Sequence, residues 1–269
     1  MNFHLRYNAP AEEKPLDNYA PDGGFASIFR TVAFVGDSLS SGEFETYNPQ
    51  KDLRRYCDMY EYSWGQYAAR MAGFTAYNFS RGGMTAAEYC ESFADMMDLW
   101  NPDRKAQAYV IALGVNEMIY SRPNLGEMSD IDPENPANNK KTFTGYYARI
   151  IQQYKAIQPG AKFFLITIPR QPFLFETTPA KVALVDAHAA RLHELAAYFD
   201  NTYVLDFRAF GPIQDEEFTR RFYMESHMNA LGYRLFAEQF CSYVDYLVRH
   251  NPADFTMVPF IGREELLEG

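Results

Sequence analysis

VAFVGDSLSSGE, residues 32–43, joins an apolar run to a glycine, an acid and a serine. The run at 32–35 has the length and composition of a buried strand. Two interpretations of its abrupt end compete. Gly, Asp and Ser are ordinary residues of a surface turn. A serine directly after a strand also stands where open α/β sheets bind their ligands, at the carboxyl ends of the strands. The rest of the chain is needed to choose between them.

Short apolar runs alternate with helical patterns along the chain. Strands are expected at five places: 31–35, 74–79, 108–113, 162–168 and 202–207. Helices are expected between and after them: 60–71, 85–99, 143–157, 179–199 and 229–248. Strands that are apolar on both faces and separated by helices predict a parallel sheet with helices on both sides.

The outer segments differ from this alternating region. Residues 1–30 are rich in proline and glycine and are expected to form an irregular N-terminal arm. The α/β domain is expected over residues 31–249, with a short C-terminal tail at 250–269. Within the domain, residues 118–141 are polar and contain three prolines, which predicts an excursion over the surface.

Composition excludes several classes of protein. Of 269 residues, 47% are hydrophobic and 22% charged, as in a globular protein with a large core. Lys and Arg number 25 against 35 Asp and Glu, and a net charge of −10 does not suit nucleic-acid binding. The N-terminus lacks an apolar signal core, and no apolar stretch reaches membrane-spanning length, so we expect a cytoplasmic protein without a membrane span.

Cysteine and histidine spacings do not predict a metal site. Cys57, Cys90 and Cys241 are odd in number and far apart, and we expect them to be reduced, buried thiols. His188 and His193 are five residues apart, which does not place them on one face of a helix. We therefore expect neither a metal nor a disulfide framework.

Polar groups follow several of the expected strands. Gly36-Asp37-Ser38 follows the first strand, 78–85 (NFSRGGMT) contains the end of the second, and 114–117 (GVNE) follows the third. His227 precedes the last helix. A serine hydroxyl needs an adjacent base to become a nucleophile. A tetrahedral intermediate needs preorganised donors for its oxyanion. These residue types are the ones that acyl transfer requires.

Four blocks in this order resemble the SGNH (GDSL) hydrolases, the family of GDSL-like lipases and acylhydrolases. They are GDSLS at 36–40, NFSRGGMT at 78–85, GVNE at 114–117 and HMNALGY at 227–233. The resemblance extends over residues 31–249. It implies a three-layer α/β/α sandwich with a flavodoxin-like, five-stranded parallel sheet, and an esterase-type hydrolase without a metal or organic cofactor.

The resemblance also implies roles for individual residues. Ser38 matches the nucleophile, His227 the base, and Gly83 and Asn116 the donors to the oxyanion, together with the Ser38 N–H group. Gly82 replaces Gly83 if the alignment shifts by one residue.

Two positions depart from the family's pattern. The third block ends in Glu117 where aspartate is usual. The family's triad acid precedes the histidine by three residues, and this position is Met224, which cannot orient an imidazole. Glu225 is one candidate for the missing acid, because residues i and i+2 of an extended segment share a face. The alternative is a Ser–His dyad oriented by a backbone carbonyl.

The sequence thus predicts a serine esterase that acts on a small-molecule ester through an acyl-enzyme. Short-chain or acetyl esters, among them esters of a carbohydrate, are favoured because no long apolar lid is visible. A lipase, lysophospholipase or thioesterase acting on longer chains is the alternative, and a non-catalytic binding module on the same fold is the alternative of another class. Phe44, Arg81 and Arg170 are candidates for substrate binding, and the oligomeric state stays open.

Overall fold

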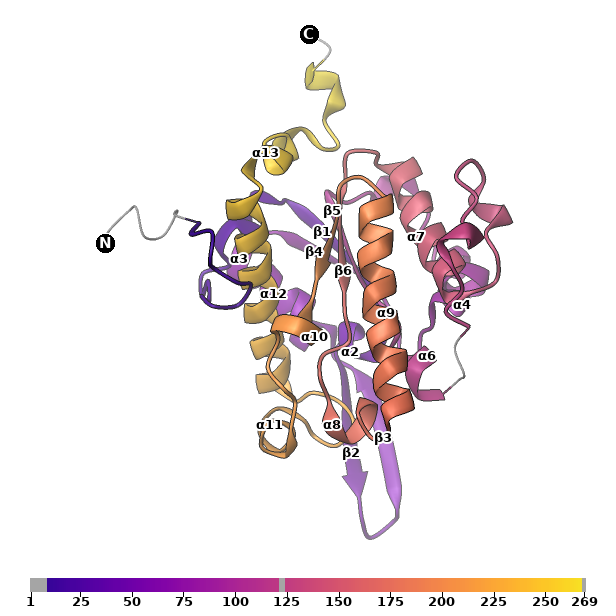
Figure 1. Ribbon diagram of the computed structural model, residues 1–269. Coiled ribbons are helices and arrows are strands. Elements are labelled where there is room, and N and C mark those ends of the chain that lie inside the picture. The colour runs from indigo at the N-terminus through magenta and orange to yellow at the C-terminus, as the bar shows by residue number, and fades with distance from the viewer. Residues whose placement is uncertain (1–8, 121–123, 268–269) are drawn as a thin grey trace, which may run out of the picture.

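The computed structural model describes residues 9–120 and 124–267. A five-stranded parallel sheet runs through its centre in the order β4-β1-β5-β6-β7 (Figure 1). The strands are β1 (Thr31–Gly36), β4 (Thr75–Ser80), β5 (Ala108–Ala112), β6 (Lys162–Ile166) and β7 (Thr202–Leu205). Taken along the chain as strands one to five, this is the flavodoxin-like order 2-1-3-4-5. The predicted fold class is confirmed.

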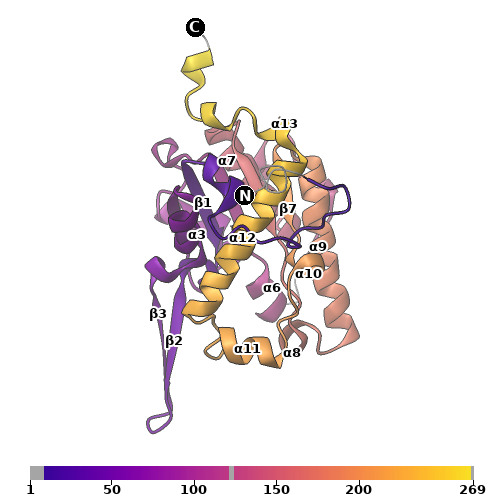
Figure 2. The ribbon, with the colours of Figure 1, turned by 90° about the vertical axis from the view of Figure 1, so that its left-hand side faces the viewer.

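Helices cover both faces of the sheet, which makes three layers (Figures 1 and 2). One face carries α3 (Trp64–Ala72) and α12 (Ala230–His250), and the other carries α7 (Phe143–Ile157) and α9 (Pro179–Tyr198). Strand β1 shows why its sequence is continuously apolar. Its residues Val32 and Phe34 join the core beneath α3 and α12, whereas Ala33 and Val35 join the core beneath α7 and α9.

Polar side chains mark where the helices begin. The Ser63 hydroxyl accepts the Gln66 N–H group at the start of α3, and Thr142 accepts that of Gly145 before α7. Thr178 does the same for α9, whose first residue is Pro179. Such caps satisfy N–H groups that have no partner within the helix.

The helix expected over 85–99 is instead three short pieces: α4 (Ala86–Glu88), a π-helical turn (Tyr89–Phe93) and α5 (Ala94–Met96).

A two-stranded antiparallel hairpin was not predicted. Strands β2 (Glu43–Asn48) and β3 (Leu53–Asp58) follow α2 (Ser38–Ser41) and project from the body of the molecule (Figure 1). The hairpin is largely exposed, and its strand sequences EFETYN and LRRYCD mix charged, polar and aromatic residues, so they lack the apolar runs that mark the other strands. Cys57 lies on this hairpin and is exposed, so the expectation of three buried thiols is wrong for Cys57 and holds for Cys90 and Cys241.

Both outer segments pack against the domain. In the N-terminal arm, the Ala20 and Phe25 N–H groups donate to Ser242 and Asp245 of α12. In the C-terminal tail, Phe255 of α13 (Pro252–Phe255) is buried.

The remaining α-helices are α6 (Val115–Tyr120), α8 (Pro172–Phe175), α10 (Phe207–Phe210) and α11 (Glu216–Phe222). Within the described residues, no helix is both long enough and apolar enough to cross a membrane.

Candidate active site

A cleft of about 1100 Å³ opens at the carboxyl ends of three sheet strands. Ser38 follows β1 in its wall, Leu113 follows β5 and Ile168 follows β6. Helices α6, α8 and α11, the β2–β3 hairpin through Glu43 and Tyr56, and the loop before α12 also contribute to the lining. This is the edge of the sheet at which parallel α/β folds bind ligands.

Ser38 is the first residue of α2, immediately beyond the turn that ends β1. The Asp37 carboxylate accepts the Leu39 N–H group at 3.0 Å and caps this short helix. Gly36 is required just before it, because a Cβ atom there would lie 2.3 Å from the Ser40 hydroxyl oxygen. The structure thus places a serine, held by a tight turn, in the wall of the cleft.

Asp37 and Glu117 are buried acids whose carboxyl groups accept backbone N–H groups. Burial, together with the nearby Glu117 carboxylate, raises the pKa of Asp37 to about 7. Glu117 is buried as well, and its Oε1 accepts the Ala86 N–H group at 2.6 Å, which connects the GVNE turn to the start of α4. Burial also raises the pKa of Glu117.

The structure brings Gly83 and Asn116 into the same cleft wall as Ser38. Gly83 adopts φ +72°, in the left-handed region that favours glycine. The buried Asn116 amide donates to the Met84 carbonyl at 3.0 Å and lies 3.4 Å from Asp37 Oδ2. Gly82 lies close to Glu43, because a Cβ atom at Gly82 would lie 2.3 Å from Glu43 Oε2. Gly83, not Gly82, is among the residues that line the cleft.

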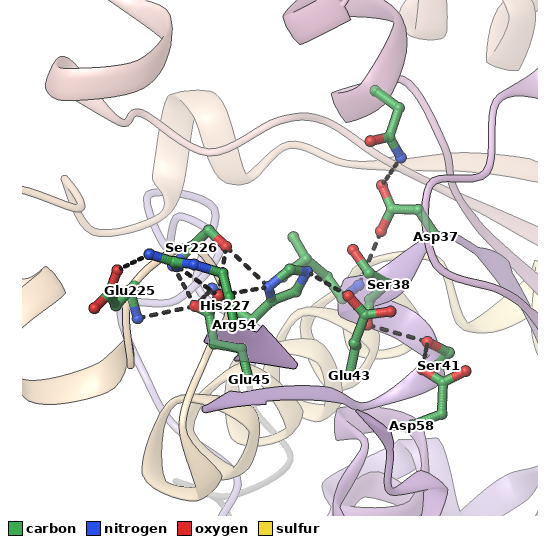
Figure 3. A network of polar contacts seen from close by, with 12 residues as sticks. Asp37, Ser38, Ser41, Glu43, Glu45, Arg54, Asp58, Glu225, Ser226 and His227 are labelled. Atoms are coloured by element: carbon green, nitrogen blue, oxygen red, sulfur yellow. Dashed lines mark hydrogen bonds and ion pairs between the residues drawn. The ribbon is translucent and has the colours of Figure 1, made fainter. Parts of the chain in front are cut away.

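His227 reaches the cleft from a tight loop between α11 and α12. The loop is closed by a bridge between Tyr223 and Met228, and the Met224 N–H group donates to the His227 carbonyl at 2.8 Å. The imidazole Nε2 lies 3.1 Å from Glu43 Oε1, and Nδ1 lies 3.0 Å from the Ser226 hydroxyl oxygen (Figure 3). Burial lowers the pKa of His227, and the Glu45 carboxylate opposes this effect.

Glu43 and Glu45 are site residues that the sequence analysis missed. Both lie on β2, two residues apart, and both face His227 (Figure 3). The Glu45 side chain is only 2% exposed, and its carboxylate accepts the N–H groups of Glu225 and His227, each at 3.0 Å, and that of Ser226. The pattern Glu-Phe-Glu was the available signal, since alternate residues of a strand share a face.

Ionisation differs between these two glutamates. Burial favours the neutral form of Glu45, but hydrogen bonds from the backbone of His227 and Ser226 outweigh it and lower the pKa of Glu45 to about 2. Burial raises the pKa of Glu43, and the Asp58 and Glu45 carboxylates add to that rise. Glu45 is therefore a fixed negative charge, whereas Glu43 gains a proton more readily than an exposed glutamate.

Glu225, the candidate acid, lies at the cleft but directs its carboxylate elsewhere. It accepts a hydrogen bond from Arg54 at 2.5 Å, and Arg54 also donates to Glu45 at 3.1 Å (Figure 3). The backbone explains this arrangement, because the Glu225 N–H group points at Glu45 inside the loop while its exposed side chain turns outward.

The three residues expected to bind substrate are engaged outside the cleft lining. Phe44 packs against Tyr62 and Tyr233, with ring centroids 5.8 and 5.5 Å away, because it points to the opposite side of β2 from Glu43. Arg81 forms an ion pair with Glu88. Arg170 forms a two-bond ion pair with Glu176, at 3.0 Å for each bond.

The described residues contain no group of three or more His, Cys, Asp or Glu side chains that could hold a metal ion. What the cleft brings together is a serine, a histidine, carboxylates, and amide and backbone donors. Such a set can perform proton transfer and nucleophilic chemistry.

Comparison with known proteins adds three structural likenesses. A family 2 carbohydrate esterase from Clostridium thermocellum, solved with cellohexaose, is 14% identical, with a TM-score of 0.56 over 91% of this chain and 67% of that one. A family 2 carbohydrate esterase from Corynascus thermopiles (Myceliophthora fergusii) that carries a carbohydrate-binding domain is 18% identical, with a TM-score of 0.51 over 82% of this chain and 66% of that one. A possible lipase from Chitinophaga pinensis is 16% identical, with a TM-score of 0.51 over 78% of this chain and 96% of that one.

At these identities the likenesses establish the fold, and the chain spans about two thirds of the length of the two carbohydrate esterases. No curated protein matches the sequence. The family model of the GDSL-like lipases and acylhydrolases matches residues 34–235, from within β1 to the start of α12. The chain therefore belongs to the GDSL-like lipase/acylhydrolase family.

Proposed function

We propose that the protein is a serine esterase that hydrolyses carboxylic esters through an acyl-enzyme. One observation carries the proposal: Ser38, Gly83, Asn116 and His227 come from four separate segments and line one cleft. A residue set with these chemistries matches the nucleophile, base and oxyanion donors of acyl transfer.

The reaction follows from the groups present. Ser38 Oγ attacks the ester carbonyl carbon while its proton passes to His227 Nε2. Nε2 faces Glu43 Oε1 at 3.1 Å, so this transfer requires the imidazole to exchange that contact for Ser38 Oγ. The oxyanion accepts hydrogen bonds from the N–H groups of Ser38 and Gly83 and from the Asn116 amide. One Asn116 N–H group must exchange its 3.4 Å contact with Asp37 Oδ2 for the oxyanion. His227 then protonates the departing alkoxide, and water repeats the two steps to release the acid and restore Ser38.

For the substrate we propose a short-chain or acetyl ester, with a carbohydrate as the alcohol. The support is that the polar side chains of Glu43 and Glu216 share the cleft lining with Ser38 and can bind hydroxyl groups, whereas Gln171 and Gln214 hydrogen-bond to each other and to Tyr223. The two carbohydrate esterases that share the fold add support for a carbohydrate as the alcohol.

A longer acyl chain is the second candidate, and a particular part of the cleft favours it. Ile119, Ile168, Phe173 and Leu174, from α6, α8 and the end of β6, line the cleft with apolar surface. Phe173 is 66% exposed, so this apolar surface continues to the exterior. A lipid or thioester acyl group fits such a lining better than a sugar does.

A fluorophosphonate probe tests the chemistry, and a substrate panel tests the class. The probe should label the wild-type protein, through an activated serine, and should not label the Ser38→Ala variant. Absence of labelling in the wild-type protein would favour a non-catalytic binding module. Aryl esters from acetyl to dodecanoyl and acetylated sugars then separate the two candidates. A kcat/KM that falls with chain length supports the acetyl esterase, and one that rises with chain length contradicts it.

A further inference from the structure

The nitrogen of His227 that faces away from the nucleophile is connected to a carboxylate through one hydroxyl group. Nδ1 lies 3.0 Å from Ser226 Oγ, and Ser226 Oγ lies 3.0 Å from Glu45 Oε2. The direct separation of Nδ1 and Glu45 Oε2 is 3.8 Å, longer than a hydrogen bond. The geometry is thus a relay of two hydrogen bonds rather than a direct pair (Figure 3).

The carboxylate at the end of this relay is held rigidly in its charged form. Its Oε1 sits inside the loop that carries the histidine and accepts three successive N–H groups, those of Glu225, Ser226 and His227. Arg54, from the partner strand β3, donates to its Oε2 at 3.1 Å. A buried acid that binds the backbone of the histidine's own loop fixes both the charge and the position of the ring.

Proton donors and acceptors impose one direction on the relay. The ionised carboxylate can only accept, so the Ser226 hydroxyl donates to Glu45. Its oxygen must then accept, so Nδ1 carries the proton and donates to Ser226. This assignment leaves Nε2 without a proton in the neutral ring, which is the tautomer that a general base needs. The 3.1 Å contact between Nε2 and Glu43 Oε1 is then a hydrogen bond donated by the protonated Glu43 carboxyl, whose pKa is raised by burial.

We propose that Glu45 is the positioning acid of His227 and acts through the Ser226 hydroxyl in place of the acid that is missing at Met224. The proposal rests on the proposed function, in which His227 is the base. Glu45 stays ionised throughout: it holds the ring in one tautomer and stabilises the imidazolium that forms when Ser38 loses its proton. The acid has thus moved from the loop of the base to the hairpin that follows the nucleophile.

Glu225 is the matched control within the same cluster. It is a glutamate, contacts the same Arg54 and lies two residues from His227, but it is exposed and has no contact with the ring in the described structure. Replacing Glu225 by glutamine removes one charge near the site without interrupting the relay.

The test compares Glu45→Gln, Ser226→Ala and Ser226→Thr with Glu225→Gln. An acid on a catalytic histidine contributes on the order of 10⁴ in turnover, so an indirect acid predicts losses in kcat of about 10²–10⁴ for Glu45→Gln. We expect a loss of at least about 10-fold for Ser226→Ala, since the carboxylate stays nearby. We further expect recovery in Ser226→Thr and a change within about 3-fold in Glu225→Gln, which leaves the relay intact.

A second readout separates positioning from general structural damage. The pKa of His227, followed by NMR titration of its ring nitrogens without substrate, should fall in Glu45→Gln and stay unchanged in Glu225→Gln. The other groups that face the ring are Glu43 on β2 and Tyr56 and Asp58 on β3, and they remain in all four variants. A merely structural role would lower kcat without moving this pKa.

Two results would overturn the relay: an unchanged His227 pKa in Glu45→Gln, or losses in Glu45→Gln and Ser226→Ala no larger than in Glu225→Gln. If Glu45→Gln does not fold, the two Ser226 variants still decide the question. Failure of the proposed function is recognised separately, because Ser38→Ala would then retain turnover while the titration still reports on the relay.

Discussion

At the scale of single residues, we propose that the Asn116 side chain serves both structure and chemistry. Its buried amide ties the start of α6 to Met84 of the glycine block through a hydrogen bond of 3.0 Å. The same amide lies in the cleft wall with Ser38 and Gly83, where an oxyanion needs a donor.

Asn116→Ala should lower kcat by about 10²–10³-fold, the usual loss for one oxyanion donor. The effect should appear in kcat rather than KM, because the hydrogen bond strengthens as charge develops in the transition state. Steady-state kinetics on an acetyl aryl ester measure both constants, and unfolding curves confirm that the variant is folded. A higher KM at unchanged kcat would assign Asn116 to substrate binding instead.

His227 also predicts how activity depends on pH. Burial lowers the pKa of this imidazole below its ordinary value of 6.5. A general base must be neutral, so kcat/KM should rise with pH and reach half of its plateau below pH 6.5. A pH profile of ester hydrolysis from pH 4 to 8 measures the midpoint.

Asp37 is another cleft group that can contribute to the pH profile, because burial raises its pKa to about 7. Asp37→Asn is a suitable control, since asparagine caps a helix as well as aspartate does. The midpoint below pH 6.5 should persist in this variant. Its disappearance would assign the low-pH step to Asp37 rather than to His227.

At the scale of elements, the β2–β3 hairpin is positioned by a sharp turn at the end of α2. Gly42 adopts φ +79° there, and a Cβ atom would lie 2.8 Å from the Met59 carbonyl oxygen. Ser41 donates to Asp58 at 2.7 Å, and Tyr233 donates to the Glu43 carbonyl at 2.7 Å. These contacts place Glu43 and Glu45 beside His227.

Gly42→Ala should therefore impair both stability and catalysis. A left-handed conformation costs an alanine about 1–2 kcal/mol, and the contact with Met59 adds to this cost by displacing the hairpin. We expect the free energy of unfolding to fall by about 2–4 kcal/mol and kcat to fall by at least about 10-fold. Denaturant unfolding and steady-state kinetics measure the two effects.

Gly73→Ala is the matched control. Gly73 has a similar φ of +83° at the end of α3, but a Cβ atom there would meet nothing within 4 Å. This variant should lose only the conformational cost of about 1–2 kcal/mol and keep its kcat. Equal kinetics in the two variants would show that the turn at Gly42 does not position the site.

At the scale of the whole molecule, a charged cluster joins the N-terminal arm to α12. Arg249 donates to Glu13 at 2.7 and 2.8 Å and to Asp245 at 2.8 Å, and the side chains of Arg249 and Glu13 are 6% and 5% exposed. The Arg249 hydrogen bonds lower the pKa of Glu13 from 4.5 to about 2, although burial opposes this. The arm is therefore held by charge as well as by packing.

Glu13→Gln should lower the free energy of unfolding at pH 7 by about 3 kcal/mol, the equivalent of the shift in pKa. Because the pKa is lower in the folded state, this stability is complete above pH 4.5 and is lost as the pH falls towards 2. Urea unfolding of both proteins should thus show a difference at pH 7 that shrinks near pH 3. Glu12→Gln, at an exposed neighbour, should change little at either pH. A difference that is independent of pH would contradict the ion-pair account.

The architecture and most of the cleft could be predicted from the amino-acid sequence. Runs that are apolar on both faces identify buried parallel strands from local pattern alone, and the strand ends identify Ser38, Gly83 and Asn116, because parallel strands direct their carboxyl ends to one edge. The family resemblance identified the remaining block, around His227. These features depend on short stretches of chain, so reading along the sequence was sufficient.

The acidic residues that lie beside His227 became visible only in the folded molecule. Glu45 lies 182 residues before His227, and the local pattern Glu-Phe-Glu shows only that it shares a face of its strand with Glu43. Glu225 was the nearer candidate in sequence, but its backbone faces Glu45 and its side chain faces Arg54. A hydrogen-bond relay depends on distances between side chains on separate elements, and these distances exist only once the hairpin has packed against the loop before α12.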